Sequence, residues 1–190
     1  MKNIISSFML ILVFTLFATP AFAAGPWRGK IIDIETKEPL EGAVVLAVWE
    51  RVYRTPTGDS SYFYEAKEVL TDKEGRFEIP SYTPINFVPL LSYMRGPHFT
   101  IFKPGYLSIE WWHGEYFLEG STEKTVKFEK YEKKYILAPG IIELPPLKTR
   151  EERLRNMPAV SVPYKKQRLL IKLINEERKN LGLEGELKIE

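Results

Sequence analysis

The chain contains no cysteine and only two histidines, His98 and His113. The missing thiols exclude disulfides, thiolate metal sites, a cysteine nucleophile and a lipidated N-terminal cysteine. Two histidines are too few for a metal centre built from several imidazoles. An excess of one charge is also missing, because 27 Lys and Arg residues face 25 Asp and Glu residues, for a net charge of +2. This balance lacks the strongly basic character typical of nucleic-acid-binding proteins, and we expect no nucleic-acid partner.

Long apolar runs are missing from all of the chain except its N-terminus. Lys2 precedes an apolar stretch from Ile4 to Ala18, and Ala21-Phe22-Ala23 offers small residues where a signal peptidase reads. We expect residues 1–23 to be a signal peptide that is cleaved after Ala23. The mature protein would then be periplasmic or secreted, without a transmembrane span. The alternative is that the segment is kept as a membrane anchor.

The middle of the chain is rich in strand signals. We expect one strand around Ile32 and Ile34 and a central strand over 43–48, which is apolar on both alternating faces. Residues 54–61 have the composition of a polar loop. Residues 81–97 are Pro-rich and apolar, and we expect an ordered crossover there, because a disordered linker would not carry so many large apolar side chains. Further strands are expected over 62–70, 76–79, 98–103, 106–113, 124–131 and 135–138. This spacing predicts a β-sandwich or barrel.

Residues 71–75, Thr-Asp-Lys-Glu-Gly, predict a hairpin turn. Asp72 can accept hydrogen bonds from the backbone ahead of it, and Gly75 can adopt positive φ. A calcium site at Asp72 and Glu74 is the alternative. It is disfavoured because Ca²⁺ takes six to eight oxygen ligands and the turn supplies fewer.

The C-terminal quarter is helical in pattern. Thr149 and Glu152 have the spacing of a capping box, which predicts a helix over 150–156. A second helix is expected over 164–181, ending at Gly182, with Leu170, Leu173, Ile174 and Leu181 on one side. Six basic residues against two acidic ones make it basic. We expect it to dock on the β-domain. The alternatives are an anionic membrane surface or a partner's groove.

The predicted organisation is a signal peptide (1–23), a β-domain (24–142), and a Pro-containing linker with a helical tail (143–190).

An ordered set of short motifs suggests a family for the β-domain. The set comprises Gly29, Asp33, Thr36, Pro39-Leu40, Gly42-Ala43, Thr71-Asp72, Gly75-x-Phe77 and Lys103-Pro104-Gly105-Tyr106. With these motifs, roughly residues 27–138 resemble the carboxypeptidase regulatory-like domain. The resemblance implies a mainly β fold, a prealbumin-like (transthyretin-like) Greek-key β-sandwich of seven strands, here with a C-terminal helical tail. It also implies a module that is usually non-catalytic. Residues 36–39 depart from the family's Thr-Gly-x-Pro pattern by reading Thr-Lys-Glu-Pro, so another turn conformation is expected there.

Enzymes on related sandwiches have signatures that this sequence lacks. Metallocarboxypeptidase zinc needs two histidines and a carboxylate, and His98 and His113 lack the companion motif. Intradiol dioxygenases hold iron with two tyrosines and two closely spaced histidines, and that histidine spacing is missing. Hydroxyisourate-type hydrolases end in Tyr-Arg-Gly-Ser, whereas this chain ends in Gly-Glu-Leu-Lys-Ile-Glu. We expect no enzymatic activity, no cofactor and no metal.

Residues 106–113 offer a candidate binding surface. On a regular strand, Leu107, Ile109 and Trp111 face the core, and the opposite face carries Tyr106, Ser108, Glu110 and Trp112. Exposed aromatics on a sheet can stack on sugars or on a partner's apolar surface. The alternative is that the 81–97 crossover or the C-terminal helix covers them.

Our prediction is a non-catalytic binding or structural module of the cell envelope that binds another protein. The alternative function is carbohydrate binding through Tyr106, Glu110 and Trp112.

Overall fold

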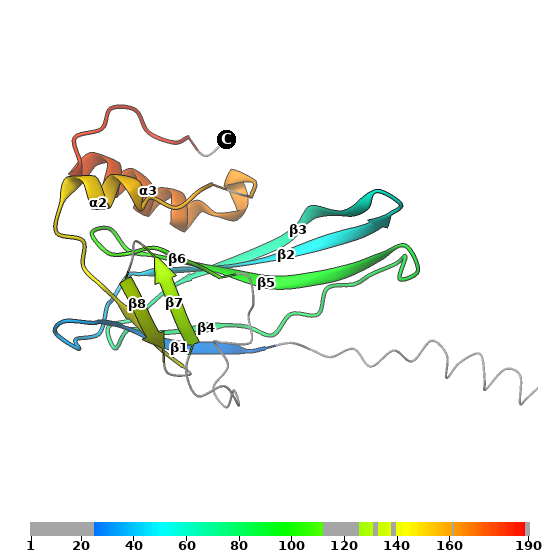
Figure 1. The fold of residues 1–190 in the computed structure, drawn as a ribbon, viewed down its shortest axis with the longest axis horizontal. Helices are drawn as coiled ribbons and strands as arrows, with labels where there is room; N and C mark the ends of the chain where they lie inside the picture. The colour runs from blue at the N-terminus through cyan, green and yellow to red at the C-terminus, as the bar shows by residue number, and fades with distance from the viewer. Residues whose placement is uncertain (1–24, 112–125, 131–132, 138–139, 161, 189–190) are drawn as a thin grey trace, which may run out of the picture.

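The computed structural model describes residues 25–111, 126–130, 133–137, 140–160 and 162–188. The predicted signal peptide, Trp112 and His113 lie outside this part of the chain. The described residues form a mainly β structure with sheets of three and four strands and a C-terminal helix, so the predicted fold class is confirmed at this level (Figure 1).

The smaller sheet has the order β4–β1–β9. Its central strand β1 (Trp27–Asp33) pairs antiparallel with β4 (Arg76–Ile79) and parallel with β9 (Ile141–Leu144). The larger sheet has the order β3–β2–β5–β6, formed by β3 (Gly58–Leu70), β2 (Val44–Thr55), β5 (Ser92–Phe102) and β6 (Ile109–Trp111). A separate pair consists of β7 (Val126–Lys130) and β8 (Lys133–Leu137). Strand β9 was not predicted, and it spans the expected domain boundary after residue 142.

Strand β2 is the central strand that its two apolar faces predicted. Val45, Ala47 and Trp49 point into a core between the two sheets, together with Trp27 and Phe99. The intervening residues Val44, Leu46 and Val48 contribute to a second cluster beneath the C-terminal helix. One strand therefore supplies two cores, because successive side chains of a strand point to opposite faces.

A turn forms at Thr71–Gly75 with the predicted roles of Asp72 and Gly75, but it is not a hairpin turn, because β3 belongs to the larger sheet and β4 to the smaller one. Asp72 Oδ1 accepts hydrogen bonds from the backbone N–H groups of Glu74 and Arg76, at 3.0 and 2.7 Å. Gly75 has φ of 73°. A Cβ at this position would lie 2.4 Å from the carbonyl oxygen of Ile31, so both the conformation and the space require glycine. The motif is thus used to carry the chain from β3 in the larger sheet to β4 in the smaller sheet.

The two predicted helices are present with small shifts. Helix α2 (Arg150–Arg155) begins with the predicted capping box of Thr149 and Glu152. The second segment divides into a 3₁₀ turn, η2 (Tyr164–Lys166), and helix α3 (Arg168–Asn180). Gly182 follows α3 with φ of 67°, and the N–H groups of Gly182 and Leu183 donate to the carbonyls of Lys179 and Arg178. This is the Schellman ending that glycine favours.

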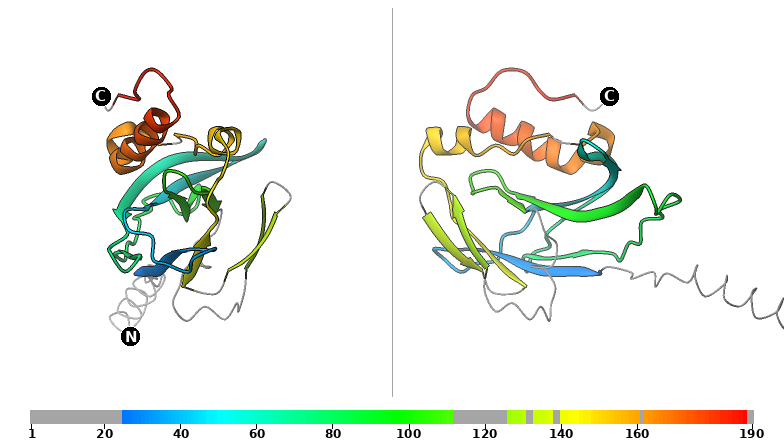
Figure 2. Two further views of the ribbon diagram at one scale, coloured as in Figure 1. Left: turned by 90° about the vertical axis from the view of Figure 1, so that its left-hand side faces the viewer. Right: turned by 45° about the vertical axis from the view of Figure 1, so that its right-hand side comes forward.

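Helix α3 packs on the outer face of the larger sheet, away from the smaller sheet (Figure 2). Leu170, Leu173 and Ile174 are buried against β2, so the apolar side of the helix is covered by its own chain. Glu68 on β3 accepts hydrogen bonds from the N–H groups of Leu169 and Leu170, at 2.8 and 3.1 Å. A carboxylate there satisfies helix-end donors and complements the helix dipole. The expectation of docking is confirmed.

An ion pair ties α2 to α3. The guanidinium of Arg153 donates to both carboxylate oxygens of Glu177, at 2.7 and 2.6 Å, and the Glu177 side chain is almost fully buried. The hydrogen bond to Glu177 raises the pKa of Arg153, although burial opposes the shift. The Arg153 guanidinium therefore stays cationic, and its two hydrogen bonds to Glu177 hold α2 against α3.

Two segments differ from their predictions. Residues 54–61 are not a loop, because β2 and β3 run through them and pair up to Thr55 and Gly58. Both faces of this ribbon are polar, which gives strands the composition of a loop. Residues 92–97, assigned by sequence to the crossover, belong to β5, and most of the large apolar side chains that precede them are exposed.

The turn at residues 36–39 has an unusual backbone conformation at Lys37. Lys37 adopts φ of 63°, the left-handed region that glycine occupies readily. The chain therefore places a strained lysine in a backbone conformation that suits glycine.

We expect Lys37→Gly to raise the free energy of unfolding by about 0.5–1 kcal/mol. Relief of left-handed strain of about 1–2 kcal/mol outweighs the added chain entropy. The exposed ion pair with Glu143 contributes little. Urea melts measure the change. Lys37→Ala is the control, because it removes the ion pair and keeps the strain. Equal stability of the two variants would contradict the strain.

Candidate binding surface

The three predicted binding residues are not shown together on one surface. Tyr106 is half-buried, and its hydroxyl donates to Asp33 Oδ2 at 3.0 Å. Glu110 is exposed on β6, opposite Thr100. Trp112 lies outside the described residues. Their role in binding stays a prediction.

Ser108, which the alternation places on the candidate binding face, is buried. Its hydroxyl donates to the carbonyl of Asn156 at 2.8 Å, and the Asn156 side chain donates to the carbonyl of Tyr106 at 2.9 Å. Residue Asn156 ends helix α2. The segment before β6 is therefore an anchor for α2, which periodicity along the strand could not reveal.

Asp33 and Tyr106 have shifted pKa values for a structural reason. Burial raises the pKa of Asp33, but hydrogen bonds from the N–H groups of Thr36 and Glu35 and from Tyr106 lower it overall. Burial and the hydrogen bond to Asp33 raise the pKa of Tyr106 to about 12. The Asp33 carboxylate closes the 33–36 turn and binds the phenol, so all of these groups are used in holding the fold.

The larger sheet extends past α3 and the smaller sheet as an arm, which we define as residues 50–64 and 80–95 (Figure 1). The arm begins where the register of β2 shifts, between Trp49 and Glu50. Sequence reasoning missed it, because its first strands were assigned to a loop. Its outer face is on the side of α3, where Phe63 packs, and its inner face is on the side of Tyr64.

The outer face of the arm carries a connected polar network. Arg95 donates to the hydroxyl of Tyr93 at 2.9 Å, and that hydroxyl donates to Asp59 at 2.9 Å. The guanidinium of Arg54 lies 5.4 Å from the centre of the Tyr93 ring. Glu50 completes the network, with its carboxylate 3.2 Å from His98 Nε2 and 3.9 Å from Arg95. We call Arg54, Asp59, Tyr93 and Arg95 the outer-face cluster.

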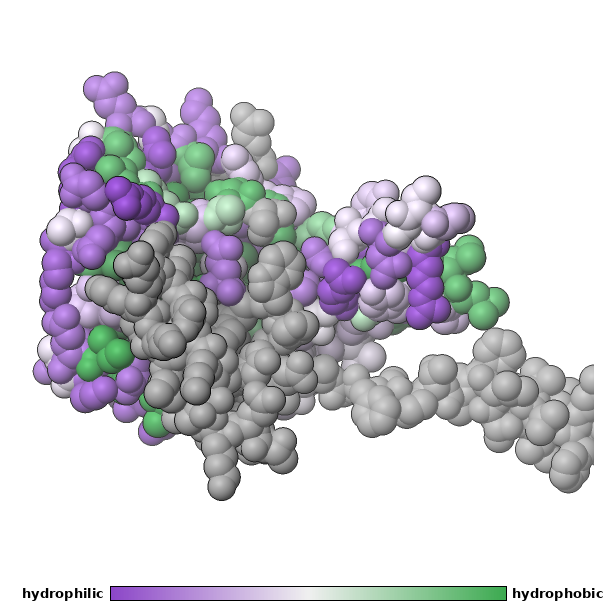
Figure 3. Space-filling view, viewed as in Figure 1, coloured by the Kyte–Doolittle hydropathy of each residue, from purple (hydrophilic) through white to green (hydrophobic). Residues whose placement is uncertain are grey.

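The inner side of the arm carries an apolar loop, residues 84–91, that points into solvent. Phe87 is 80% exposed and Leu90 is 90% exposed, and Ile85, Val88 and Leu91 are exposed as well. Apolar atoms form the outermost end of the arm in the space-filling view (Figure 3). A run of exposed large apolar side chains marks an interaction site more often than a single one does. Composition alone could have identified the segment, but not its exposure.

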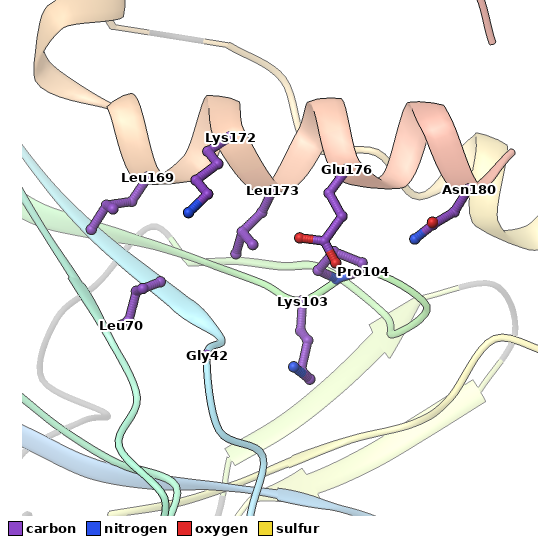
Figure 4. Close-up of a pocket in the computed structure, with 9 residues that line it drawn as sticks. All are labelled: Gly42, Leu70, Lys103, Pro104, Leu169, Lys172, Leu173, Glu176 and Asn180. Atoms are coloured by element: carbon purple, nitrogen blue, oxygen red, sulfur yellow. The ribbon is translucent and has the colours of Figure 1, made fainter. Parts of the chain in front are cut away.

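A shallow pocket lies between α3 and the rim of the larger sheet (Figure 4). It measures about 360 Å³ and is lined by Lys172, Leu173 and Glu176 from the helix and by Leu70 and Lys103 below. Lys103 Nζ donates to the carbonyl of Glu41 at 2.6 Å, so this cation already has a partner. The pocket is therefore a gap along the contact between the docked helix and the sheet.

Other sites were sought among the described residues. No group of three or more His, Asp or Glu side chains there is arranged to hold a metal ion. His98 lies within β5, with its Nε2 3.2 Å from the Glu50 carboxylate. Within the same part of the chain, no helix has the length and hydropathy needed to cross a bilayer.

Comparison with known proteins adds little. The chain matches no family model and no curated protein sequence. A solved structure that aligns in part is the 3-chlorocatechol 1,2-dioxygenase of Rhodococcus opacus 1CP, with 16% sequence identity and a TM-score of 0.31. The alignment covers 65% of this chain and 62% of that chain. A likeness this distant carries no argument about fold type or chemistry.

Proposed function

We propose that the protein is an exported, non-catalytic binding module of the cell envelope, and that it binds another envelope protein through the outer face of its arm. The observation that carries the proposal is the outer-face cluster. It lies on the paired strands β2, β3 and β5 of the arm, which extends past the docked helix (Figure 1). Tyr and Arg are the residue types over-represented at the energetic centres of protein interfaces.

Preorganisation supports this use of the cluster. Tyr93 is held by Arg95 and Asp59, and Arg95 also donates to Ser61 at 3.2 Å. Side chains that are already fixed lose little entropy when a partner binds. The hydrogen bond to Tyr93 raises the pKa of Arg95, so the guanidinium stays cationic. A partner with acidic and aromatic groups would match this surface.

The family proposal is consistent with the architecture. A carboxypeptidase regulatory-like domain with a Greek-key prealbumin-like sandwich would use Gly29, Thr71, Gly75 and Phe77 as structural positions. In this chain Gly75 closes the turn, and Thr71 links residues 40 and 43 through its hydroxyl. The exported location of the module rests on the N-terminal sequence alone.

The test compares two charge-reversed variants in the native envelope. Crosslinking followed by mass spectrometry identifies the partner, which is then purified and titrated against the protein. Arg54→Glu with Arg95→Glu should weaken binding at least tenfold. Lys172→Glu with Lys179→Glu on the exposed side of α3 is the matched control and should bind as the parent does.

Two outcomes would overturn the proposal. Equal affinity of both variants for the purified partner would place the interface elsewhere. A positive glycan array with quenched tryptophan fluorescence would establish carbohydrate binding instead, and Tyr106→Ala and Glu110→Ala would then be the variants to compare.

A further inference from the structure

Polar groups of the apolar loop (84–91) form hydrogen bonds within the loop and with the neighbouring strands. Asn86 accepts from Val88 N–H and donates to the carbonyl of Ser92, at 3.2 and 2.7 Å. The carbonyl of Ile85 accepts from both Arg51 and Tyr64, each at 3.3 Å. The loop is therefore ordered by its backbone and by three polar side chains. Its large apolar side chains are exposed and do not contribute to these hydrogen bonds.

This arrangement suits a lipid environment better than water. A segment that enters the bilayer interface must satisfy its own backbone groups, because hydrocarbon offers no hydrogen bonds. The internal bonds of the apolar loop provide this for several of its groups. Burial of its exposed side chains would then supply the free energy of association.

The residues around the loop match the layers of a membrane surface, with an uncharged apolar segment outermost and tyrosine and arginine side chains behind it. Residues 80–94 contain no charged side chain. On the inner face, Arg51 contacts the loop: its guanidinium donates to the carbonyl of Ile85 and lies 4.9 Å from the centre of the Tyr64 ring. Tyr62 lies opposite Arg51 in the strand register, and its ring centre is 5.7 Å from that of Tyr53. Tyrosine is enriched at the membrane interface, and arginine binds phosphate headgroups.

The start of β1 lies at the base of the same arm. Trp27 contacts Trp49, where the arm begins, with ring centres 5.5 Å apart. Only six residues separate Gly25 from Ala18, the end of the apolar N-terminal run, and the seven steps between them reach at most about 25 Å. While that run is in a membrane, as an uncleaved signal or as an anchor, the arm is kept close to the bilayer.

We propose that the apolar loop inserts into the interface of an anionic phospholipid bilayer and orients the arm on the membrane surface. The loop and the outer-face cluster lie on opposite sides of the arm, so this proposal does not depend on the protein-binding one. Insertion of the loop would leave the outer face free for a protein partner.

The absence of cysteine allows a site-specific test in the full chain. Phe87→Cys and, as the control, Tyr164→Cys on η2 are each labelled with the environment-sensitive dye NBD. Vesicles contain one part phosphatidylglycerol to two parts phosphatidylcholine. The dye at position 87 should brighten several-fold and be quenched by doxyl-labelled lipid, whereas the dye at 164 should not respond. An unresponsive dye at 87 on vesicle-bound protein would overturn the proposal. So would a response only to a purified envelope protein, which would identify a protein groove as the occupant.

A substitution test measures how much the loop contributes. Leu90→Ser with Leu91→Ser should leave the melting temperature unchanged, because both side chains are exposed. Each buried leucine is worth about tenfold or more in partitioning, so vesicle co-sedimentation should fall at least tenfold. Ile141→Ser with Tyr164→Ser changes exposed apolar residues elsewhere and should bind as the parent does. The N-terminal run is common to all variants and cannot account for a difference. Equal binding by the two double variants would contradict insertion.

Discussion

Phe77→Ala is expected to lower the free energy of unfolding by about 3–5 kcal/mol, as large-to-small changes in a packed core do. Phe77 is 5% exposed and belongs to the core between the two sheets. Its ring lies over Gly29 on the neighbouring strand, where an added Cβ would come within 2.8 Å of it. The missing side chain of Gly29 makes room for the ring, so the two positions pack as a unit.

The same substitution at an exposed position provides the control. Phe87→Ala removes an identical group from a side chain that is 80% exposed, and should change stability by less than about 0.5 kcal/mol. Urea unfolding followed by tryptophan fluorescence measures both variants. A loss below about 1 kcal/mol for Phe77→Ala, or equal losses at the two positions, would show that β4 does not face the core.

Features encoded by neighbouring residues could be predicted from the sequence. The capping box of Thr149 and Glu152 and the turn at Asp72 and Gly75 each depend on bonds within five residues. The two apolar faces of residues 43–48 also identified a central strand, because a strand with a solvent face would alternate with polar residues. In each case the local pattern and the final environment agree.

Features that depend on distant parts of the chain were missed. Strand β9 exists through parallel pairing with β1, more than 100 residues earlier, and its few residues carry no turn signal. The cap of α3 comes from Glu68 on β3. Residues 54–61, at the end of the β2–β3 ribbon, look like a loop in sequence because both faces of the ribbon are polar there. The apolar loop has the composition of a buried crossover, and only the fold shows that most of its side chains lack cover.

Removal of the C-terminal tail after Pro158 is the change with the largest expected effect. It uncovers Val44, Leu46 and Phe102 on the outer face of the larger sheet. It also removes Leu170, Leu173 and Ile174, whose burial is worth roughly 1.5–3 kcal/mol each. The sum is comparable to the whole stability of a typical domain. We expect the melting temperature to fall by at least roughly 10 °C and the exposed face to cause self-association.

Smaller changes keep this prediction testable if the truncated chain fails to fold. Ile174→Ala should cost about 2–5 kcal/mol, as a buried isoleucine does. Lys179→Ala on the exposed side of the same helix should cost less than about 0.5 kcal/mol. Thermal melts and light scattering measure stability and association together. A truncated protein that melts at the parent temperature and stays monomeric would mean that α3 does not cover the sheet in solution. The helix would then be free to bind a partner, which is the alternative that the basic residues of the segment 164–181 left open.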